Sequence, residues 1–254
     1  MEEVEGIILV LSCQKHMNTR LKEFKLNKNE YIGWKVFYVI GDLFLKNEYE
    51  IKDTNYLYIR CEDSYLHLLK KLTLSMKIIY SIFNIKQGIL RCGDDLMFNE
   101  KRLIDFLSEE TKPDYCGDSC PRRDFKCTNR ECLKKTEKTD WMINYYKNNK
   151  SDFDNPLHGL KDIDISIYNI KPAIFGAYGT LYYISNKSCK TIIDHMESIK
   201  FDILNKNDFS QNYPYIIEDV GISFILYYNY IDYIEKGYFC KSSNPIANHT
   251  NKFK

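Results

Sequence analysis

Residues 87–95 read Gln-Gly-Ile-Leu-Arg-Cys-Gly-Asp-Asp, and this stretch decides the fold that we expect. Its first six residues have strand character, and the strand runs directly into a glycine and two aspartates. Short, continuous apolar runs, which suit strands buried on both faces, occur at residues 7–12, 35–40 and 56–60. Together these runs predict several strands of one buried sheet.

The segment between the runs at residues 56–60 and 87–92 has a different period. In residues 62–84 the apolar side chains recur at three- and four-residue steps, which predicts one long helix with a single apolar stripe. Asp63 or Ser64 can cap its start. Alternating strands and helices predict an α/β fold with a central, mostly parallel sheet flanked by helices. Such sheets bind ligands at the carboxyl ends of their strands, where Asp94 and Asp95 lie.

The second half of the chain is less regular. Residues 111–155 are charged and poor in aliphatic side chains, which predicts an inserted region with little strand character. Strand character returns at residues 165–174 and 180–184, and residues 219–233 are typical of a helix. The polar tail, residues 242–254, is expected to be a loop. We therefore expect one domain over residues 1–254, with an insertion and a polar tail.

Composition excludes several classes of function. There are 36 Lys plus Arg residues and 35 Asp plus Glu residues, and the resulting net charge of +1 gives no general attraction to nucleic acid. No apolar run approaches the roughly 18–20 residues that a membrane span needs, and no signal peptide is recognised. We therefore expect a cytoplasmic protein, with a secretory compartment as the alternative if the chain has been trimmed.

Four of the nine cysteines cluster in the predicted insertion, at Cys116, Cys120, Cys127 and Cys132. Their spacing differs from the paired Cys-x2-Cys pattern of zinc sites, so zinc binding, disulfides and free thiols all stay open. One hypothesis for the whole chain is accordingly an interaction domain stabilised by zinc.

Two acidic pairs can carry chemistry. Asp94 and Asp95 can hold a divalent cation that bridges a diphosphate, although Gly-Asp-Asp is also a common turn sequence. Glu218 and Asp219 can supply a general base for a sugar hydroxyl, although acidic residues also favour the first turn of a helix. His249, in the polar tail, is a candidate metal ligand.

The order of these motifs is more specific than any one of them. The sequence resembles the β-1,3-galactosyltransferase and Fringe-like family of inverting glycosyltransferases over about residues 6–235. The resemblance rests on the strand at 7–12, Arg20 and Trp34, the strand at 37–41, Glu62-Asp63-Ser64-Tyr65 with Lys71, Arg91-Cys92-Gly93-Asp94-Asp95, Gly179-Thr180-Leu181-Tyr182, and Glu218-Asp219-Val220.

This resemblance implies a glycosyltransferase-A type fold and a metal-dependent transfer of a hexose or N-acetylhexosamine from a UDP-sugar to a glycan hydroxyl, with a β-1,3 linkage. The implied cation is Mn²⁺ or Mg²⁺. The implied roles are given by residue as follows: metal binding by Asp95, Asp94 and His249; catalysis by Asp219, with Glu218 second; nucleotide binding by Arg20, Asp63, Lys71 and Asp94; sugar and acceptor binding by Gly179 and Tyr182.

The sequence departs from the family pattern at two positions. Gly93 stands where the family has the first aspartate of an acidic triple, so metal binding rests on Asp95 with Asp94 as helper. Gly221 follows the Glu-Asp-Val motif two residues earlier than the family's glycine does. The alternative function is a catalytically degenerate module that binds a nucleotide sugar or a glycan.

Overall fold

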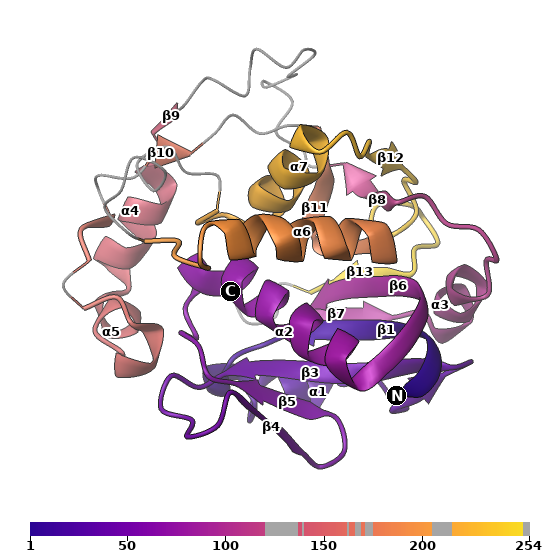
Figure 1. Cartoon of the computed structure of the whole chain (residues 1–254), viewed down its shortest axis with the longest axis horizontal. Helices are drawn as coiled ribbons and strands as arrows, with labels where there is room; N and C mark the ends of the chain where they lie inside the picture. The colour runs from indigo at the N-terminus through magenta and orange to yellow at the C-terminus, as the bar shows by residue number, and fades with distance from the viewer. Residues whose placement is uncertain are drawn as a thin grey trace.

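The expected α/β architecture, a large sheet flanked by helices, is confirmed by the structure, which is a computed structural model (Figure 1). Within the part of the chain that is described, the main sheet has nine strands. The described residues are 1–119, 137–138, 140–161, 163–165, 169–170, 175–204 and 215–250.

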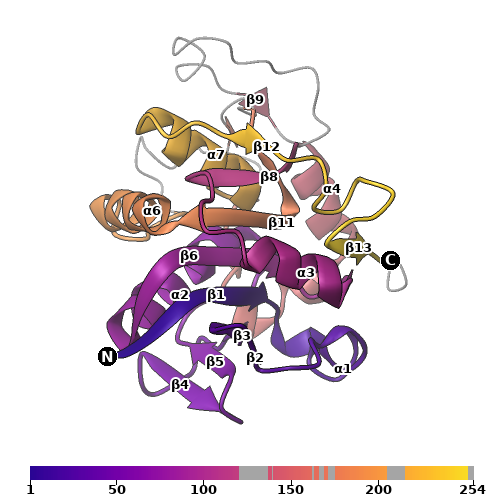
Figure 2. The same cartoon turned by 90° about the vertical axis from the view of Figure 1, so that its right-hand side faces the viewer.

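The strand order of the main sheet can be followed in Figure 2. The four central strands β5, β3, β1 and β6 are parallel, whereas β11 runs antiparallel to both of its neighbours and β4 antiparallel to β5. The sheet is therefore parallel in its centre and mixed at both sides. In order across the sheet, the strands are β12 (Ile234–Glu235), β8 (Tyr115–Ser119), β11 (Ala177–Ser185), β6 (Phe83–Gly93), β1 (Glu2–Leu11), β3 (Trp34–Gly41), β5 (Tyr56–Ile59) and β4 (Tyr49–Lys52), with β2 (Glu30–Tyr31) paired to β3.

Burial on both faces explains the continuous apolar runs. In β1, Ile7 and Leu9 belong to the core on one face of the sheet, and Ile8 and Val10 belong to the core on the other. Helices α2 (Leu68–Ile82), α6 (Asn186–Ser198) and α7 (Glu218–Tyr228) cover the first face, where Figure 1 shows them stacked. Helices α1 (Arg20–Phe24) and α3 (Glu100–Leu107) cover the second. Each fully buried aliphatic side chain contributes about 1.5–3 kcal/mol to folding.

The smaller elements surround this framework. They are η1 (Gln14–His16), η2 (Tyr65–His67), β7 (Leu96–Phe98), β9 (Glu137–Lys138), α4 (Asp140–Asn148), α5 (Lys150–Phe153), η4 (Pro156–His158), β10 (Asn169–Ile170) and β13 (Ala247–His249). None of the described helices has the length and apolar character that a membrane crossing requires.

Two expectations about loops are wrong. The region expected to have little strand character contains β8, which joins the main sheet beside β11 and buries Tyr115 and Cys116. The tail expected to be a loop contains β13, which pairs antiparallel with β7 and sets His249 opposite Leu96. In both cases the strand is short and is stabilised by a distant partner, so the local sequence carries little strand signal.

The start of the long helix also differs from the expectation. A 3-10 turn, η2, precedes α2, and neither Asp63 nor Ser64 caps a backbone amide there. The Ser64 hydroxyl instead contacts Nδ1 of His67 at 2.5 Å, and the Asp63 carboxylate faces the end of β3.

Of the clustered cysteines, Cys116 is a buried free thiol, and the other three lie outside the described residues. The expected strand at residues 165–174 also lies largely outside them, with only β10 described.

Candidate active site

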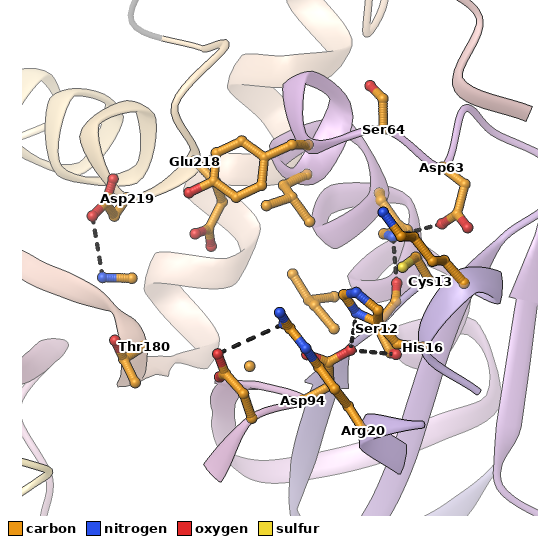
Figure 3. A pocket seen from close by; sticks show the side chains of 18 of the residues that line it. Ser12, Cys13, His16, Arg20, Asp63, Ser64, Asp94, Thr180, Glu218 and Asp219 are labelled. Carbon is orange, nitrogen blue, oxygen red and sulfur yellow. Dashed lines mark hydrogen bonds and ion pairs between the residues drawn. The ribbon is translucent and has the colours of Figure 1, made fainter. Parts of the chain in front are cut away.

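One pocket of about 290 Å³ lies at the carboxyl ends of β1 and β6, where the parallel sheet was expected to bind a ligand. Its walls also include residues of η1, α1, η2, α4, α5, η4, β11, the N-terminus of α7 and β13. Figure 3 shows Glu218 and Asp219 of α7 across the pocket from Arg20, His16 and Asp94. The pocket brings together nine of the ten predicted site residues: Arg20, Asp63, Lys71, Asp94, Asp95, Gly179, Glu218, Asp219 and His249.

Asp94 is buried, and its carboxylate contacts three other side chains of the site. Its Oδ2 accepts a hydrogen bond from Ser12 at 2.7 Å and lies 2.7 Å from Nδ1 of His16, and its Oδ1 accepts from Nη1 of Arg20 at 3.2 Å. The structure thus gives Asp94 the task of positioning two cationic side chains. Its role as a helper metal ligand stays a prediction.

The charges around Asp94 reinforce each other. Burial by itself would lower the pKa of His16, but hydrogen bonds to Asp94 and Cys13 raise it to about 9. Burial would likewise raise the pKa of Asp94, but the hydrogen bond from His16, together with Ser12 and Arg20, holds it below its ordinary value. At neutral pH, His16 and Arg20 are both positively charged and flank an ionised Asp94 (Figure 3).

Asp95 meets His249 although 154 positions separate them. Nε2 of His249 lies 3.1 Å from Oδ2 of Asp95, because β13 pairs with the strand that follows Asp95. Nη1 of Arg20 lies 3.7 Å from the same oxygen. Both side chains of the Asp95–His249 pair are partly exposed to the pocket, as a metal ligand must be.

Asp95 and His249 are the two candidate ligands for a divalent cation. In the residues that the structure describes, no group of three or more His, Cys, Asp or Glu side chains is arranged to hold a metal ion. Mg²⁺ is commonly bound through one or two carboxylates, with substrate phosphates and water completing the shell. Asp95 offers one such carboxylate, and the imidazole of His249 lies beside it.

Asp63 and Lys71 form a buried ion pair on the floor of the pocket. Nζ of Lys71 lies 2.9 Å from Oδ1 of Asp63 and 2.6 Å from the carbonyl oxygen of Ser12. The carboxylate also accepts from the backbone amides of Gly41 at 2.9 Å and Gln14 at 2.8 Å. These two residues, predicted to contact a nucleotide, therefore brace the ends of β1 and β3 against α2.

The requirement for glycine at position 41 follows from this arrangement. A Cβ atom there would lie 2.8 Å from Oδ1 of Asp63 and 3.0 Å from its Cα.

Asp219 lies at the N-terminus of α7 and is held in place by two backbone amides, one from β11 and one from α7. Its Oδ2 accepts from the amide of Gly179 at 3.1 Å, and its Oδ1 accepts from the amide of Val220 at 2.9 Å. A side chain at Gly179 would press on Asp219, with a Cβ only 3.2 Å from Oδ2. The carboxylate is thus oriented, lines the pocket and retains lone pairs for a further proton.

The carboxylate of Glu218 is buried and is paired with other buried side chains. Its Oε2 lies 3.0 Å from Nη2 of Arg91, and its Oε1 accepts a hydrogen bond from the hydroxyl of Tyr182. Burial raises the pKa of Glu218, against the opposing effect of Arg91. Arg91 also donates to the carbonyl oxygen of Gly179. Arg91, Glu218 and Tyr182 together therefore fix the backbone at Gly179, next to Asp219.

Tyr182 is the one predicted site residue that the pocket does not contain. It is fully buried in the core, and its hydroxyl reaches the site only through Glu218. Sequence reasoning in turn missed Ser12, His16 and Arg91. Their signals were the polar residues directly after the first strand and an arginine within an apolar strand.

Comparison with known proteins gives one finding of similarity. The family model described as Galactosyltransferase matches residues 27–225, which is most of the chain and includes the ends of β3 and β6, the η2–α2 segment and the N-terminus of α7. No curated protein matches the chain significantly.

Proposed function

Because the chain belongs to the galactosyltransferase family, we propose that it transfers a hexose or N-acetylhexosamine from a UDP-sugar to a glycan hydroxyl with inversion, assisted by Mn²⁺ or Mg²⁺. Family membership supports glycosyl transfer in general, with a sugar donor and an acceptor. The donor, the β-1,3 linkage and the cation are our proposal.

One observation carries this proposal. A single pocket has an oriented, partly exposed carboxylate, Asp219, on one wall, and a group of cationic side chains and candidate metal ligands on the facing wall (Figure 3). The second group consists of His16, Arg20, Asp95 and His249. Inverting transfer needs this separation, because the base and the leaving group act on opposite sides of the anomeric carbon.

Asp219 serves as the general base. It accepts the proton of the acceptor hydroxyl as the hydroxyl oxygen forms a bond to the anomeric carbon. The bond from that carbon to the diphosphate breaks, and its electron pair leaves on the diphosphate. The amides of Gly179 and Val220 fix the carboxylate for this task.

The facing wall stabilises the departing diphosphate. Arg20 and the charged His16 supply positive charge at the point where negative charge develops. Asp95 and His249 would hold a divalent cation, which when bound neutralises phosphate charge as a Lewis acid. Asp94 keeps Arg20 and His16 in position.

A screen of UDP-sugars for release of UDP, with and without Mn²⁺, tests the proposal. We expect turnover of at least one donor, and in Asp219→Asn a fall in transfer rate of about 10²–10⁴-fold with UDP affinity retained. The matched control is Asp194→Asn, on the exposed face of α6 outside the pocket. Wild-type transfer in Asp219→Asn would move the base elsewhere.

One observation favours a second candidate, a module that binds a nucleotide sugar without transfer. The first acidic position of the family's triple is Gly93, where a Cβ would lie 3.0 Å from Oδ1 of Asp95. A third carboxylate at this point would therefore crowd Asp95. Calorimetry with UDP and Mn²⁺ alongside the release assay separates the two functions, because binding without release identifies the module.

A further inference from the structure

Two exposed aromatic side chains line the pocket on the wall that carries Asp219. Tyr65 is 50% exposed and Tyr178 is 39% exposed, although both line the cavity. Large aromatic surfaces that stay accessible inside a pocket indicate a ligand that covers them. The function proposed above leaves both residues unused.

The position of Tyr178 results from an irregularity in β11. Ala177 pairs with Ser119 and Tyr182 pairs with Gly117, so five steps along β11 correspond to two steps along β8. Such bulges bend a strand and re-aim its side chains, often next to active sites. Here the extra residues of β11 include Tyr178 and Gly179, which line the pocket beside Asp219.

Tyr65 lies near the same carboxylate but belongs to η2, whereas Tyr178 belongs to β11. It is the first residue of η2, and half of its surface is open while its hydroxyl end is enclosed by protein. This burial raises the pKa of its phenol, and the nearby negative charges of Asp219 and Glu218 act in the same direction. Tyr178 also lies within electrostatic reach of this hydroxyl. Tyr65 and Tyr178 therefore lie near each other and near Asp219 in the pocket, with half of the Tyr65 surface accessible.

We propose that Tyr65 and Tyr178 form a stacking platform for a neutral pyranose ring of the acceptor and present one of its hydroxyls to Asp219. This inference rests on the function proposed above. A pyranose has an apolar C–H face that matches an aromatic ring, and polar edges that match the carboxylate. Aromatic side chains suit such ligands because they offer a large, stiff apolar surface.

The charges on each wall decide which substrate occupies the platform. Arg20 and His16 suit the diphosphate and lie on the other wall. A third pocket tyrosine, Tyr145, belongs to that wall, because its hydroxyl donates to Asp152 and Arg20 lies within its electrostatic reach. Near the platform the carboxylate of Asp219 disfavours anionic sugars, because like charges repel.

The test compares Tyr65→Ala and Tyr178→Ala with Tyr65→Phe and Tyr178→Phe. The control is Tyr49→Ala, which removes a tyrosine of similar exposure (37%) from β4 at the far edge of the sheet. The acceptors are methyl β-galactoside, methyl β-glucoside and the anionic methyl β-glucuronide. Three quantities are measured for each variant: the KM for the acceptor, the rate of donor hydrolysis without acceptor, and the affinity for UDP.

We expect each alanine variant to raise the KM for a neutral acceptor about tenfold. The phenylalanine variants and the control should stay within about twofold of the wild type, and UDP affinity and donor hydrolysis should not change. The glucuronide should have a KM at least about tenfold above that of the glucoside in the wild type.

Three results would overturn the platform alone: an unchanged acceptor KM in the alanine variants, an equal loss in the phenylalanine variants, or a parallel loss of UDP affinity. Failure of the proposed function has a different signature, because the wild type would then neither bind UDP nor release it from any donor. That result would also overturn the platform as an acceptor site.

Discussion

The buried pair of Arg91 and Glu218 offers the sharpest test of how this site is held together. The perturbations are Arg91→Met, Glu218→Gln and the double variant, since methionine and glutamine roughly keep the volumes of the side chains that they replace. Both wild-type side chains are about 5% exposed, and their charged atoms lie 3.0 Å apart. Each single variant leaves one buried charge without its main partner.

The expected magnitude follows from this burial. Removing one member of a buried ion pair costs about 3–5 kcal/mol, whereas replacing both members is often close to neutral. We expect each single variant to lose about 3 kcal/mol of unfolding free energy, and a coupling energy of about 2–3 kcal/mol between the two sites. For a chain of this size, a single variant should melt roughly 10 °C lower.

The pH dependence of Arg91→Met has a definite sign. Burial already raises the pKa of Glu218 in the wild type, and Arg91 is the main influence that lowers it. Without Arg91 the folded state binds a proton at Glu218 more tightly than the unfolded state does, so stability rises as the pH falls. The deficit of Arg91→Met should therefore shrink between pH 8 and pH 5.5.

The assay is urea unfolding of the four proteins at several pH values, combined as a double-mutant cycle. Lys77→Met and Glu197→Gln form the control cycle, because that pair is 2.7 Å apart but largely exposed and should couple by less than about 1 kcal/mol. Additive losses at Arg91 and Glu218, or a deficit in Arg91→Met that does not change with pH, would refute the assigned structural role of Glu218.

Three further predictions concern the other charged groups of the site. The pKa of His16 is about 9 when folded and 6.5 when unfolded, so its contacts with Asp94 and Cys13 together contribute up to about 3 kcal/mol below pH 6.5, and this contribution is lost as the pH rises through 9; urea unfolding of His16→Gln should show a weaker decline over that range. Lys71→Met strands the buried Asp63 carboxylate and should cost about 3–5 kcal/mol, so a melting curve within 2 °C of the wild type would contradict the pairing. His249→Ala removes one of the two candidate cation ligands, and titration of the transfer rate should show at least a tenfold higher Mn²⁺ requirement, with no change in melting temperature without metal.

The central elements of the fold could be predicted because their signals are local. A strand buried on both faces has apolar side chains at most of its positions, and residues 7–12, 35–40, 56–60 and 87–92 all coincide with strands of the parallel centre. The helical period likewise located α2, although its start and its end each differ by a few residues. The sites of Asp94 and Asp95 followed directly, because they are adjacent in sequence to the end of a strand.

The roles of individual side chains were harder to predict, because they depend on partners that no local pattern specifies. From the sequence, Asp63 could have been a helix cap or a nucleotide ligand. Its pairing with Lys71 and with two backbone amides depends on how β3 and α2 pack together. Tyr182 belongs to a segment that lines the pocket, but strand alternation and the bulge in β11 direct its ring into the core.

The sequence alone determined that this chain forms an α/β sheet with acidic residues at a strand end, since burial and backbone periodicity act between neighbouring residues. Only the tertiary structure decided that His249 meets Asp95, that Arg20 and His16 meet Asp94, and that Asp219 faces them across one pocket. These contacts join segments up to 154 positions apart. Their geometry is set by strand pairing and by the packing of helices on the sheet, which the amino-acid pattern of any one segment leaves open.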